Sequence, residues 1–249
     1  MKKLYLLLLS LSIWGLHLSA QTDTKIIADS LYAQNKYKEA AALYEEMLNQ
    51  GDNAILYYNL GNAYYRMDDL AHAILNYERA VQREPGDGDI RFNLTLARSK
   101  TVDKIQSTDD FFLLYWLRSF VNMFNTDQWG RLSIFMFLIT LFGGLCYFFA
   151  HCLLWRKIGF GVGLAAFGLV ILFNLFAYMQ RRQYLDATHA IVMKSATVKS
   201  TPAESGTAIF ELHEGTKVKL LDTSMREWTE IRLSDGKSGW ISKNSIEII

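Results

Sequence analysis

Two long apolar runs near the middle of the 249-residue chain constrain its fold more than any other feature. They are Leu132–Trp155 and Ile158–Tyr178, and each has about 20 residues, the length that an α-helix needs to cross the hydrocarbon core of a bilayer. Hydrophobic residues make up 51% of the chain, and these runs concentrate them. The sequence therefore predicts a multidomain membrane protein with transmembrane helices at 132–155 and 158–179, joined as a hairpin by a tight turn.

The N-terminus has the pattern of an export signal. Two lysines precede a nearly unbroken apolar run, Leu4–Leu18, and the small pair Ser19-Ala20 follows it. This order is typical of a signal peptide, and the run is short for a membrane span. We therefore expect residues 1–20 to be a signal peptide, cleaved after Ala20, and the chain that follows to be exported. The alternative is an uncleaved segment that becomes an anchor, and in that case too the residues after it cross the membrane.

An internal repeat occupies the region between the signal and the apolar runs. Its central unit reads Tyr57-x2-Leu60-Gly61-x2-Tyr64, then Ala73-x3-Tyr77, then Pro85. This order matches the tetratricopeptide repeat (TPR) pattern W-x2-L-G-x2-Y…A-x3-F…P, with Tyr in place of the Trp and the Phe. Gly61 and Ala73 are small where paired helices cross closely.

The repeat continues weakly on both sides of its central unit. Ala40 and Tyr44 correspond to Ala73 and Tyr77 upstream, and Asn93 corresponds to Asn59 downstream. We expect an α-helical TPR solenoid over residues 21–106 with about two and a half repeats, near the minimum for a stable stack. The alternative is a generic helical bundle.

The segment at 107–131 links the repeats to the apolar runs. Its stretch Phe111–Phe124 is apolar but too short to span a bilayer, and Arg118 and Asn122 share one helical face within it. We interpret this stretch as an interfacial helix on the bilayer surface. Trp129 and Arg131 follow it, where membrane-interface anchors are common.

The second apolar run carries a face made for close helix contact. Gly159-x3-Gly163 is a small-residue motif that lets two helix backbones approach. The face fits either the first run or another membrane protein, and the sequence leaves both open. His151 and Asn174, single polar groups near opposite ends of their spans, are predicted to form hydrogen bonds between helices.

From about His189 onward, short β-branched runs alternate with turn signals. Asp235-Gly236 lies between two alternating runs and is a strong hairpin signal. Leu212–Val218, Trp228–Ile231 and Asp235–Ile241 make the segment similar to the bacterial SH3-like domain. A small all-β SH3-like barrel is therefore expected at 188–249. We place Trp240 in its core and take Trp228 as the candidate aromatic on a ligand-facing surface.

The composition and the motifs argue against an enzyme active site. The net charge of +1 does not fit a sequence-independent grip on nucleic acid, which needs a basic face. The five histidines are scattered with no metal-ligand spacing, and Cys146 and Cys152 fit apolar packing positions. No phosphate-binding glycine loop is present. We therefore expect no catalytic residue, metal or cofactor, and no enzyme.

One helical face of the central repeat carries polar and aromatic residues apart from the packing positions. By resemblance to other TPRs this face lines a groove in which Asn side chains hold an extended peptide. The alternative is a solvated face. The groove residues that we predict are Tyr58, Asn59, Asn62, Tyr65, Arg66 and, one repeat on, Asn93.

The whole order of segments resembles the BatE family of the Bacteroides aerotolerance (Bat) group, and the run Phe92–Lys100 is part of the likeness. The resemblance implies an accessory membrane component of oxidative-stress tolerance. Its implied partners are other Bat membrane proteins with von Willebrand factor A domains and a MoxR-type ATPase. The family contributes no assigned catalytic residue.

Topology follows from the export signal more than from charge. Arg156 and Lys157 between the spans favour a cytoplasmic turn, but Arg131 and Arg181 flank the spans on the other side. The exported N-terminus decides, so we expect the bacterial inner membrane, with the TPR and SH3-like domains in the periplasm. The leading hypothesis is a scaffold that recruits proteins or extended peptides. The competing one is a cell-wall sensor whose SH3-like domain binds peptidoglycan.

Overall fold

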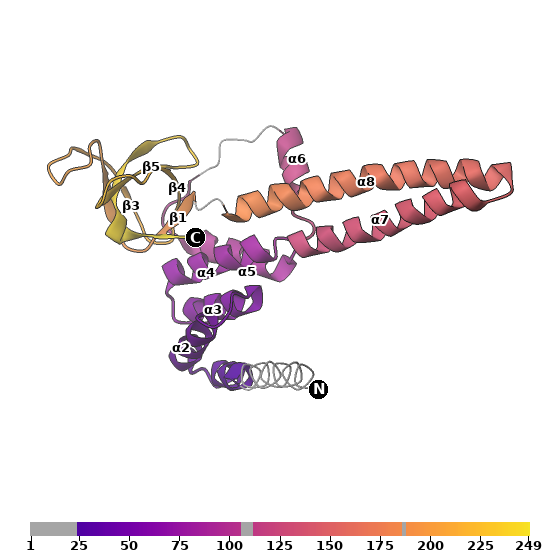
Figure 1. Cartoon of the computed structure of the whole chain (residues 1–249). Helices are drawn as coiled ribbons and strands as arrows, with labels where there is room; N and C mark the ends of the chain where they lie inside the picture. The colour runs from indigo at the N-terminus through magenta and orange to yellow at the C-terminus, as the bar shows by residue number, and fades with distance from the viewer. Residues whose placement is uncertain (1–23, 106–111, 186–187) are drawn as a thin grey trace, which may run out of the picture. The chain divides into compact units, whose positions relative to one another are not determined.

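The computed structural model describes residues 24–105, 112–185 and 188–249 (Figure 1). The predicted signal peptide, residues 1–20, lies outside the described residues. The described chain forms two compact units. The first combines residues 24–81, 87–105 and 188–249, and the second combines residues 82–86 and 112–185. The first unit is therefore discontinuous in sequence, and the second interrupts it at residues 82–86 and again at 112–185.

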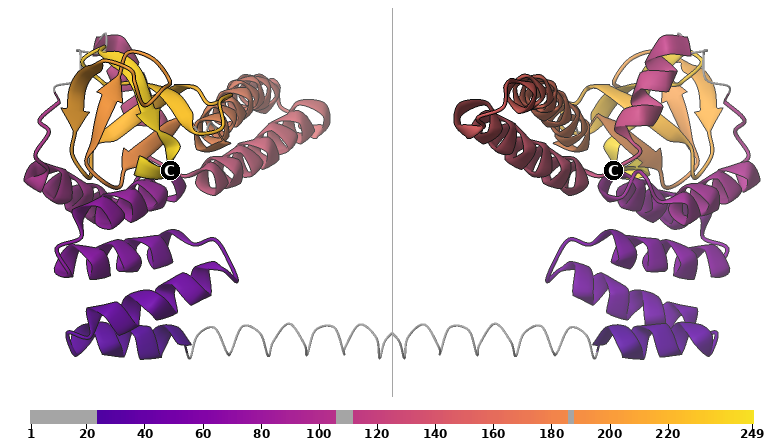
Figure 2. Two further views of the ribbon diagram at one scale, coloured as in Figure 1. Left: turned by 90° about the vertical axis from the view of Figure 1, so that its left-hand side faces the viewer. Right: turned by 90° about the vertical axis from the view of Figure 1, so that its right-hand side faces the viewer.

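The N-terminal part of the first unit is a stack of helices. Residues 24–33 are helical, and four more helices follow them in order (Figure 2). The turns inside the first two helix pairs are alike, because Asn35 and Asp68 both have φ of 62°. Asn and Asp tolerate this left-handed conformation better than other non-glycine residues. The four later helices are α2 (Tyr37–Leu48), α3 (Ala54–Arg66), α4 (Leu70–Arg83) and α5 (Gly88–Lys100).

Helix starts and helix crossings follow from local chemistry. The Asn53 side chain caps α3 by accepting a hydrogen bond from the Ile55 N–H (2.8 Å), and Asp87 caps α5 in the same way. Gly61 on α3 faces Tyr77 on α4 so closely that a Cβ at position 61 would lie 2.7 Å from the tyrosine ring. The small residue that the sequence predicts at a helix crossing is therefore required there.

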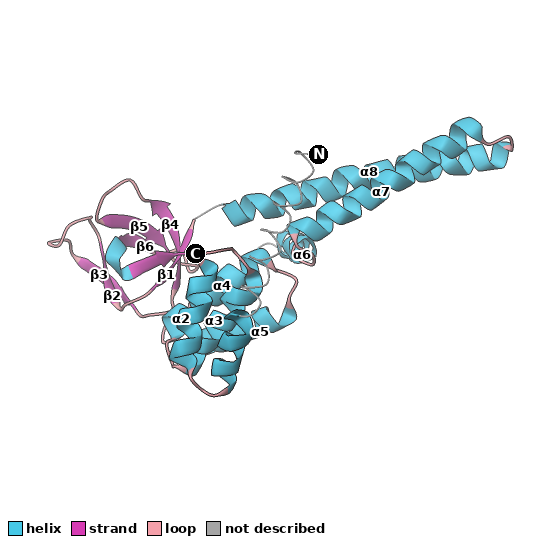
Figure 3. Ribbon diagram, turned by 60° about the horizontal axis from the view of Figure 1, so that its bottom comes forward, coloured by secondary structure: helices cyan, strands magenta, loops and turns pink. Residues whose placement is uncertain are grey.

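The C-terminal part of the first unit is a seven-stranded antiparallel sheet, drawn in magenta in Figure 3. Its order is β3-β2-β6-β5-β4-β1-β7. Gly236, at φ 92°, forms the predicted turn between β5 and β6. The strands are β1 (His189–Val192), β2 (Ala196–Lys199), β3 (Ala208–Leu212), β4 (Lys217–Asp222), β5 (Trp228–Arg232), β6 (Ser238–Ser242) and β7 (Ile246–Ile248).

The sheet is not a closed barrel, which corrects the sequence prediction. Closure would require β3 and β7, the two ends of the strand order, to pair with each other. Instead the three-residue β7 pairs only with β1, and the Arg79 guanidinium of α4 donates to the Ile248 carbonyl (2.8 Å). The alternating pattern still buries one face, whose core includes Val192, Val198, Ile231 and Ile241.

Helices and sheet share an apolar cluster within the first unit. Ile74 and Leu75 of α4 and Leu94 of α5 pack with Ile191 of β1. All four side chains are buried. The two parts of the first unit are thus one packed body, although they lie on opposite sides of the inserted segment in the sequence.

The second unit contains α6 (Phe112–Val121), α7 (Thr126–Phe149) and α8 (Leu153–Leu185). Both α7 and α8 are long and apolar enough to cross a membrane, and most of their apolar side chains are exposed in the structure. Their turn is Ala150–Cys152, whereas the sequence placed it near Arg156. The difference arises because α8 begins at Leu153, so Arg156 lies in its first turn and donates to the Tyr147 carbonyl (3.1 Å).

The glycine face of α8 packs on α7. A Cβ on Gly143 would lie 2.6 Å from the Gly159 carbonyl oxygen and 2.9 Å from the Gly163 Cα. Near the other end of the hairpin, Asn174 donates a hydrogen bond to Ser133 (2.6 Å). Of the two partners that the sequence left open for this face, the structure shows the first span. The predicted interhelical bond of Asn174 is present, whereas His151 is exposed in the turn between α7 and α8.

Trp129 does not lie at an exposed anchor position, contrary to the sequence interpretation. It is 1% exposed and packs with Val121 of α6 and Phe176 of α8. Its indole N–H donates to the Val121 carbonyl (2.9 Å). Asn125 caps α7, so Trp129 lies in the first turn of that helix, where residues of α6 and α8 pack on it.

Candidate functional site

A cleft of about 370 Å³ lies on the helical repeats. Four of the predicted groove residues line it, and they come from α3 and α5. Its other walls come from the helix at 24–33 and from α4. The lining residues are Tyr32, Asn62, Tyr65, Arg66, Tyr77, Asn93 and Leu96.

Hydrogen bonds fix the floor of the cleft. Tyr77, which is 1% exposed, donates from its hydroxyl to Asn62 Oδ1 (2.7 Å). Asn93 donates from its side-chain amide to the same oxygen (3.0 Å) and to the Tyr58 hydroxyl (3.0 Å). Burial raises the pKa of Tyr77, so its phenol stays protonated and keeps donating. The Asn62 carbonyl oxygen is thus held by two donors.

The same arrangement occurs one repeat earlier. Tyr44 donates to Asp29 Oδ1 (2.7 Å), and Asn59 donates to the same oxygen (3.3 Å). Tyr44, Asp29 and Asn59 thus correspond to Tyr77, Asn62 and Asn93 of the next repeat. Each group ties a tyrosine of the second helix to the first helices of two successive repeats. Asn59 therefore belongs to this neighbouring group and does not line the cleft.

Sequence reasoning found only part of the cleft. The predicted residues that line it are Asn62, Tyr65, Arg66 and Asn93. The predicted Tyr58 contributes its hydroxyl to the floor. Three lining residues were missed: Tyr32, Tyr77 and Leu96. Tyr32 and Leu96 occupy the repeat positions of Tyr65 and Asn62, so strict use of the repeat period would have found them. Tyr77 is predicted only as a position of the repeat pattern.

Among the described residues that line the cleft, the one that is charged is a cation, and a second cation lies beside it. Arg66 is exposed, and its hydrogen bond to Tyr32 raises the pKa of its guanidinium. Lys100 of α5 places its ammonium 4.3 Å from the centre of the Tyr65 ring, a cation–π contact. None of the seven lining residues is Asp or Glu. The cleft therefore offers amide, aromatic and cationic groups, which suit a peptide that carries a carboxylate.

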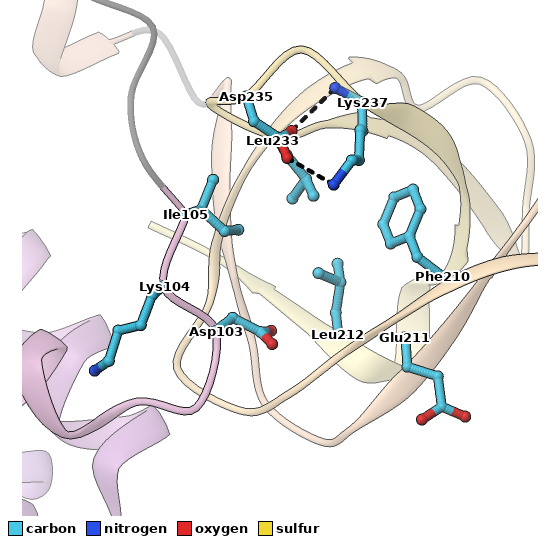
Figure 4. A pocket seen from close by; sticks show the side chains of 9 residues that line it. All are labelled: Asp103, Lys104, Ile105, Phe210, Glu211, Leu212, Leu233, Asp235 and Lys237. Carbon is cyan, nitrogen blue, oxygen red and sulfur yellow. Dashed lines mark hydrogen bonds and ion pairs between the residues drawn. The ribbon is translucent and has the colours of Figure 1, made fainter.

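The sheet has a second hollow, of about 340 Å³, beside its β3 edge (Figure 4). Phe210 and Leu212 of β3 and Leu233 form its apolar part, and Ile105 closes it from the segment that follows α5. On its rim the Lys237 ammonium pairs with the Asp235 carboxylate (3.0 Å). The hollow thus has both apolar and charged walls, because Asp103, Lys104 and Glu211 line it as well.

Asp103 anchors the segment that forms one wall of this hollow. Its carboxylate accepts hydrogen bonds from the His213 backbone N–H (2.7 Å), the Thr216 hydroxyl (2.7 Å) and the His213 ring Nδ1 (2.8 Å). Burial alone would raise the pKa of Asp103, but these hydrogen bonds outweigh it and lower the pKa. The carboxylate therefore stays ionised.

The roles predicted for the two tryptophans of the sheet are not those in the structure. Trp228, the candidate ligand-facing residue, is 9% exposed, and the Lys199 ammonium lies 5.2 Å from its ring centre. Trp240, predicted in the core, is only partly buried. Alternation explains this outcome, because Ile241 is fully buried and its neighbour Trp240 must point to the opposite face.

Titratable groups in the described residues do not gather into a metal centre. Within 24–105, 112–185 and 188–249, no three His, Cys, Asp or Glu side chains are placed to hold an ion. Cys146 and Cys152 are free thiols.

Comparison with known protein families identifies two segments. Residues 54–87 match the tetratricopeptide repeat family, and residues 194–247 match the bacterial SH3 domain family. The chain contains a TPR repeat and a bacterial SH3 domain. Both domain types are those that the sequence predicts, and the TPR match covers α3 and α4, which bear the cleft's Asn62 and Tyr77. No curated protein matches the chain.

Proposed function

We propose that the protein is a membrane-held adaptor whose TPR cleft binds an extended peptide of a protein partner, and that it is not an enzyme. The observation that carries the proposal is the cleft itself, with Asn62 and Asn93 fixed at its floor and Arg66 at its edge. Preordered amides lower the entropy cost of holding a peptide backbone. TPR and bacterial SH3 domains both fit binding roles.

The exposed residues around the cleft indicate what the peptide carries. Leu96 lines the cleft and is 39% exposed, and Phe92, one turn earlier on α5, is 67% exposed. Large apolar side chains exposed side by side are typical of interaction surfaces. Arg66 and Lys100 add two cations. We therefore propose a peptide with an apolar side chain next to a carboxylate.

Both domains lie on the same side of the membrane in this proposal. The TPR helices and the SH3 domain pack as one body, yet α7 and α8 separate them in the sequence. Two spans return the chain to the side from which it started, so the packing supports a hairpin through the bilayer. With the predicted export signal, this side is the periplasm of a bacterial inner membrane.

The resemblance of the segment order to the BatE family extends the proposal to a complex. In it, the cleft recruits Bat membrane proteins with von Willebrand factor A domains, in a stress-tolerance assembly with a MoxR-type ATPase. The support for this step is the resemblance and the presence of two binding domains on one anchor.

Charge reversal at the cleft tests the function. Arg66→Glu with Lys100→Glu changes two exposed side chains and should reduce the recovery of copurified partners from native membranes at least about tenfold. The matched control is Arg91→Glu with Lys38→Glu, which makes the same charge change at exposed positions that do not line the cleft. Equal partner recovery from both double variants would contradict the proposal.

A second candidate function is binding of peptidoglycan by the SH3 domain. The observation in its favour is the hollow beside β3, which offers both apolar and charged walls. Sedimentation of the full chain in detergent with insoluble peptidoglycan would discriminate the two. Co-pelleting that the Arg66→Glu, Lys100→Glu variant retains would favour this candidate, and pelleting no greater than that of an unrelated membrane protein would remove it.

A further inference from the structure

The helical repeats end on the SH3 domain. In a TPR stack each repeat packs on its neighbours, and the last one needs a cap that covers its apolar side. The α5 helix is the first helix of a third repeat, and no second helix follows it between Lys100 and Ile105, the end of that described stretch. The apolar residues of α4 and α5 pack instead on Ile191, and Met193 and Ile249 join the same cluster.

A buried carboxylate lies at the centre of the contact between α4, α5 and the sheet, which we call the joint. Glu78 of α4 is 4% exposed and is held by cations from two directions. Lys217 of β4 donates to its Oε2 (2.9 Å), and Arg98 of α5 pairs with its Oε1. Burial alone would raise the pKa of Glu78, but the charges of Lys217 and Arg98 outweigh it and lower the pKa. Removing either cation would leave a buried charge undercompensated.

Shape reinforces the joint at Gly215. Its φ of +82° suits glycine, and a Cβ there would lie 2.8 Å from Thr101 Cγ2 and 3.0 Å from Ile74 Cδ1. The loop between β3 and β4 thus fits against the end of α5 and the side of α4. Asp103 holds the same loop through His213 and Thr216.

We infer that the SH3 domain is the C-terminal cap of the TPR stack and that α5 couples it to the peptide cleft. The α5 helix takes part in both the cleft and the joint. Its Asn93 forms hydrogen bonds at the cleft floor, and its Arg98 pairs with the buried Glu78. Lys100, at the end of the same helix, contacts Tyr65 across the cleft. A change that loosens the joint loosens α5, and with it the cleft.

This coupling is reciprocal. A ligand that orders α5 at the cleft also stabilises the joint, and a ligand of the SH3 domain that strengthens the joint preorders the cleft. The coupling is independent of what the cleft binds. It requires only that the stability of α5 depends on residues of the sheet.

Hydrogen exchange measured by mass spectrometry on the full chain in detergent tests the coupling without a ligand. Lys217→Ala removes one of the two cations from Glu78 and should raise the exchange rates of α5 amides about tenfold, although no TPR residue is changed. The matched control is Lys219→Ala, on the same strand but exposed, which should leave α5 unchanged.

A second variant keeps the test decisive. Ile191→Ala opens a cavity on the apolar side of the joint, where Ile191 is fully buried, and should also raise α5 exchange. Faster exchange of α5 amides in both variants supports the cap. Faster exchange in Ile191→Ala alone also supports it, and then the apolar cluster is its main contact. Exchange of α5 in both variants equal to that of Lys219→Ala would overturn the inference.

Discussion

Substitution of Gly61 by Ala tests how tightly the central repeat is packed. The added Cβ would lie 2.7 Å from Cδ1 and Cε1 of Tyr77, closer than atoms in contact can approach, so the ring must move. Tyr77 is 1% exposed and its hydroxyl bonds Asn62, so movement strains the core and disturbs the floor of the cleft. The substitution therefore affects both packing and the site.

The expected change in the free energy of unfolding follows from two costs and one gain. Overpacking of a core costs about 1–3 kcal/mol. Loss of the buried Tyr77–Asn62 hydrogen bond costs roughly 1 kcal/mol more. Replacement of Gly by Ala in a helix interior returns roughly 1 kcal/mol. The net destabilisation is about 1–3 kcal/mol, which lowers the melting temperature of a unit of this size by roughly 3–10 °C.

Differential scanning calorimetry of the full chain in detergent measures this shift. The control is Gly88→Ala, because Gly88 on α5 has open space around its Cβ position and should melt at the wild-type temperature or slightly above it. In a Tyr77→Leu background the cost of Gly61→Ala should shrink, since the ring that clashes is gone. A Gly61→Ala variant as stable as wild type would refute the close crossing of α3 and α4.

Two further predictions concern the joint and the hairpin. Folding lowers the pKa of Glu78 and of Asp103, so their ionised carboxylates stabilise the fold above the usual carboxyl pKa of about 4. This stabilisation is lost as the pH falls through the lower pKa values of the folded state. The melting temperature should therefore fall in acid, and it should fall less steeply for Glu78→Gln. Equal pH profiles would contradict the role of Glu78. In the hairpin, Gly143→Ala meets the Gly159 carbonyl and should destabilise the α7–α8 pair by roughly 1–3 kcal/mol, while Gly144→Ala, with open space, should not. Unfolding in mixed micelles that ranks the two variants equally would argue against this packing.

The sequence predicted those features that depend on local spacing. The TPR pattern places Gly61 and Ala73 where helices cross, and Gly61 lies there against Tyr77. Alternating residues and Asp235-Gly236 placed the hairpin between β5 and β6, with Gly236 in the left-handed conformation. Such features are set by neighbours a few residues away, so a single sequence carries them.

Features that depend on distant neighbours were missed. The bonds of Asp103 to His213 and of Glu78 to Lys217 join residues more than 100 positions apart, and no periodicity records such a pair. Closure of the sheet likewise depends on the distant contacts of β7, whose Ile248 carbonyl accepts a hydrogen bond from Arg79 of α4. The exposure of Trp240 was misjudged from residue type, although the strand alternation with Ile241 already contained the answer.

Site-specific photo-cross-linking in living cells tests the central claim, that the TPR cleft binds a protein partner. A photoreactive amino acid replaces Leu96, which lines the cleft, or in the control Thr95, which is exposed beside it on the same helix but does not line the cleft. The adaptor account predicts adducts of discrete mass from position 96 and none of those adducts from position 95. No adduct from position 96, or the same adducts from both positions, would contradict it.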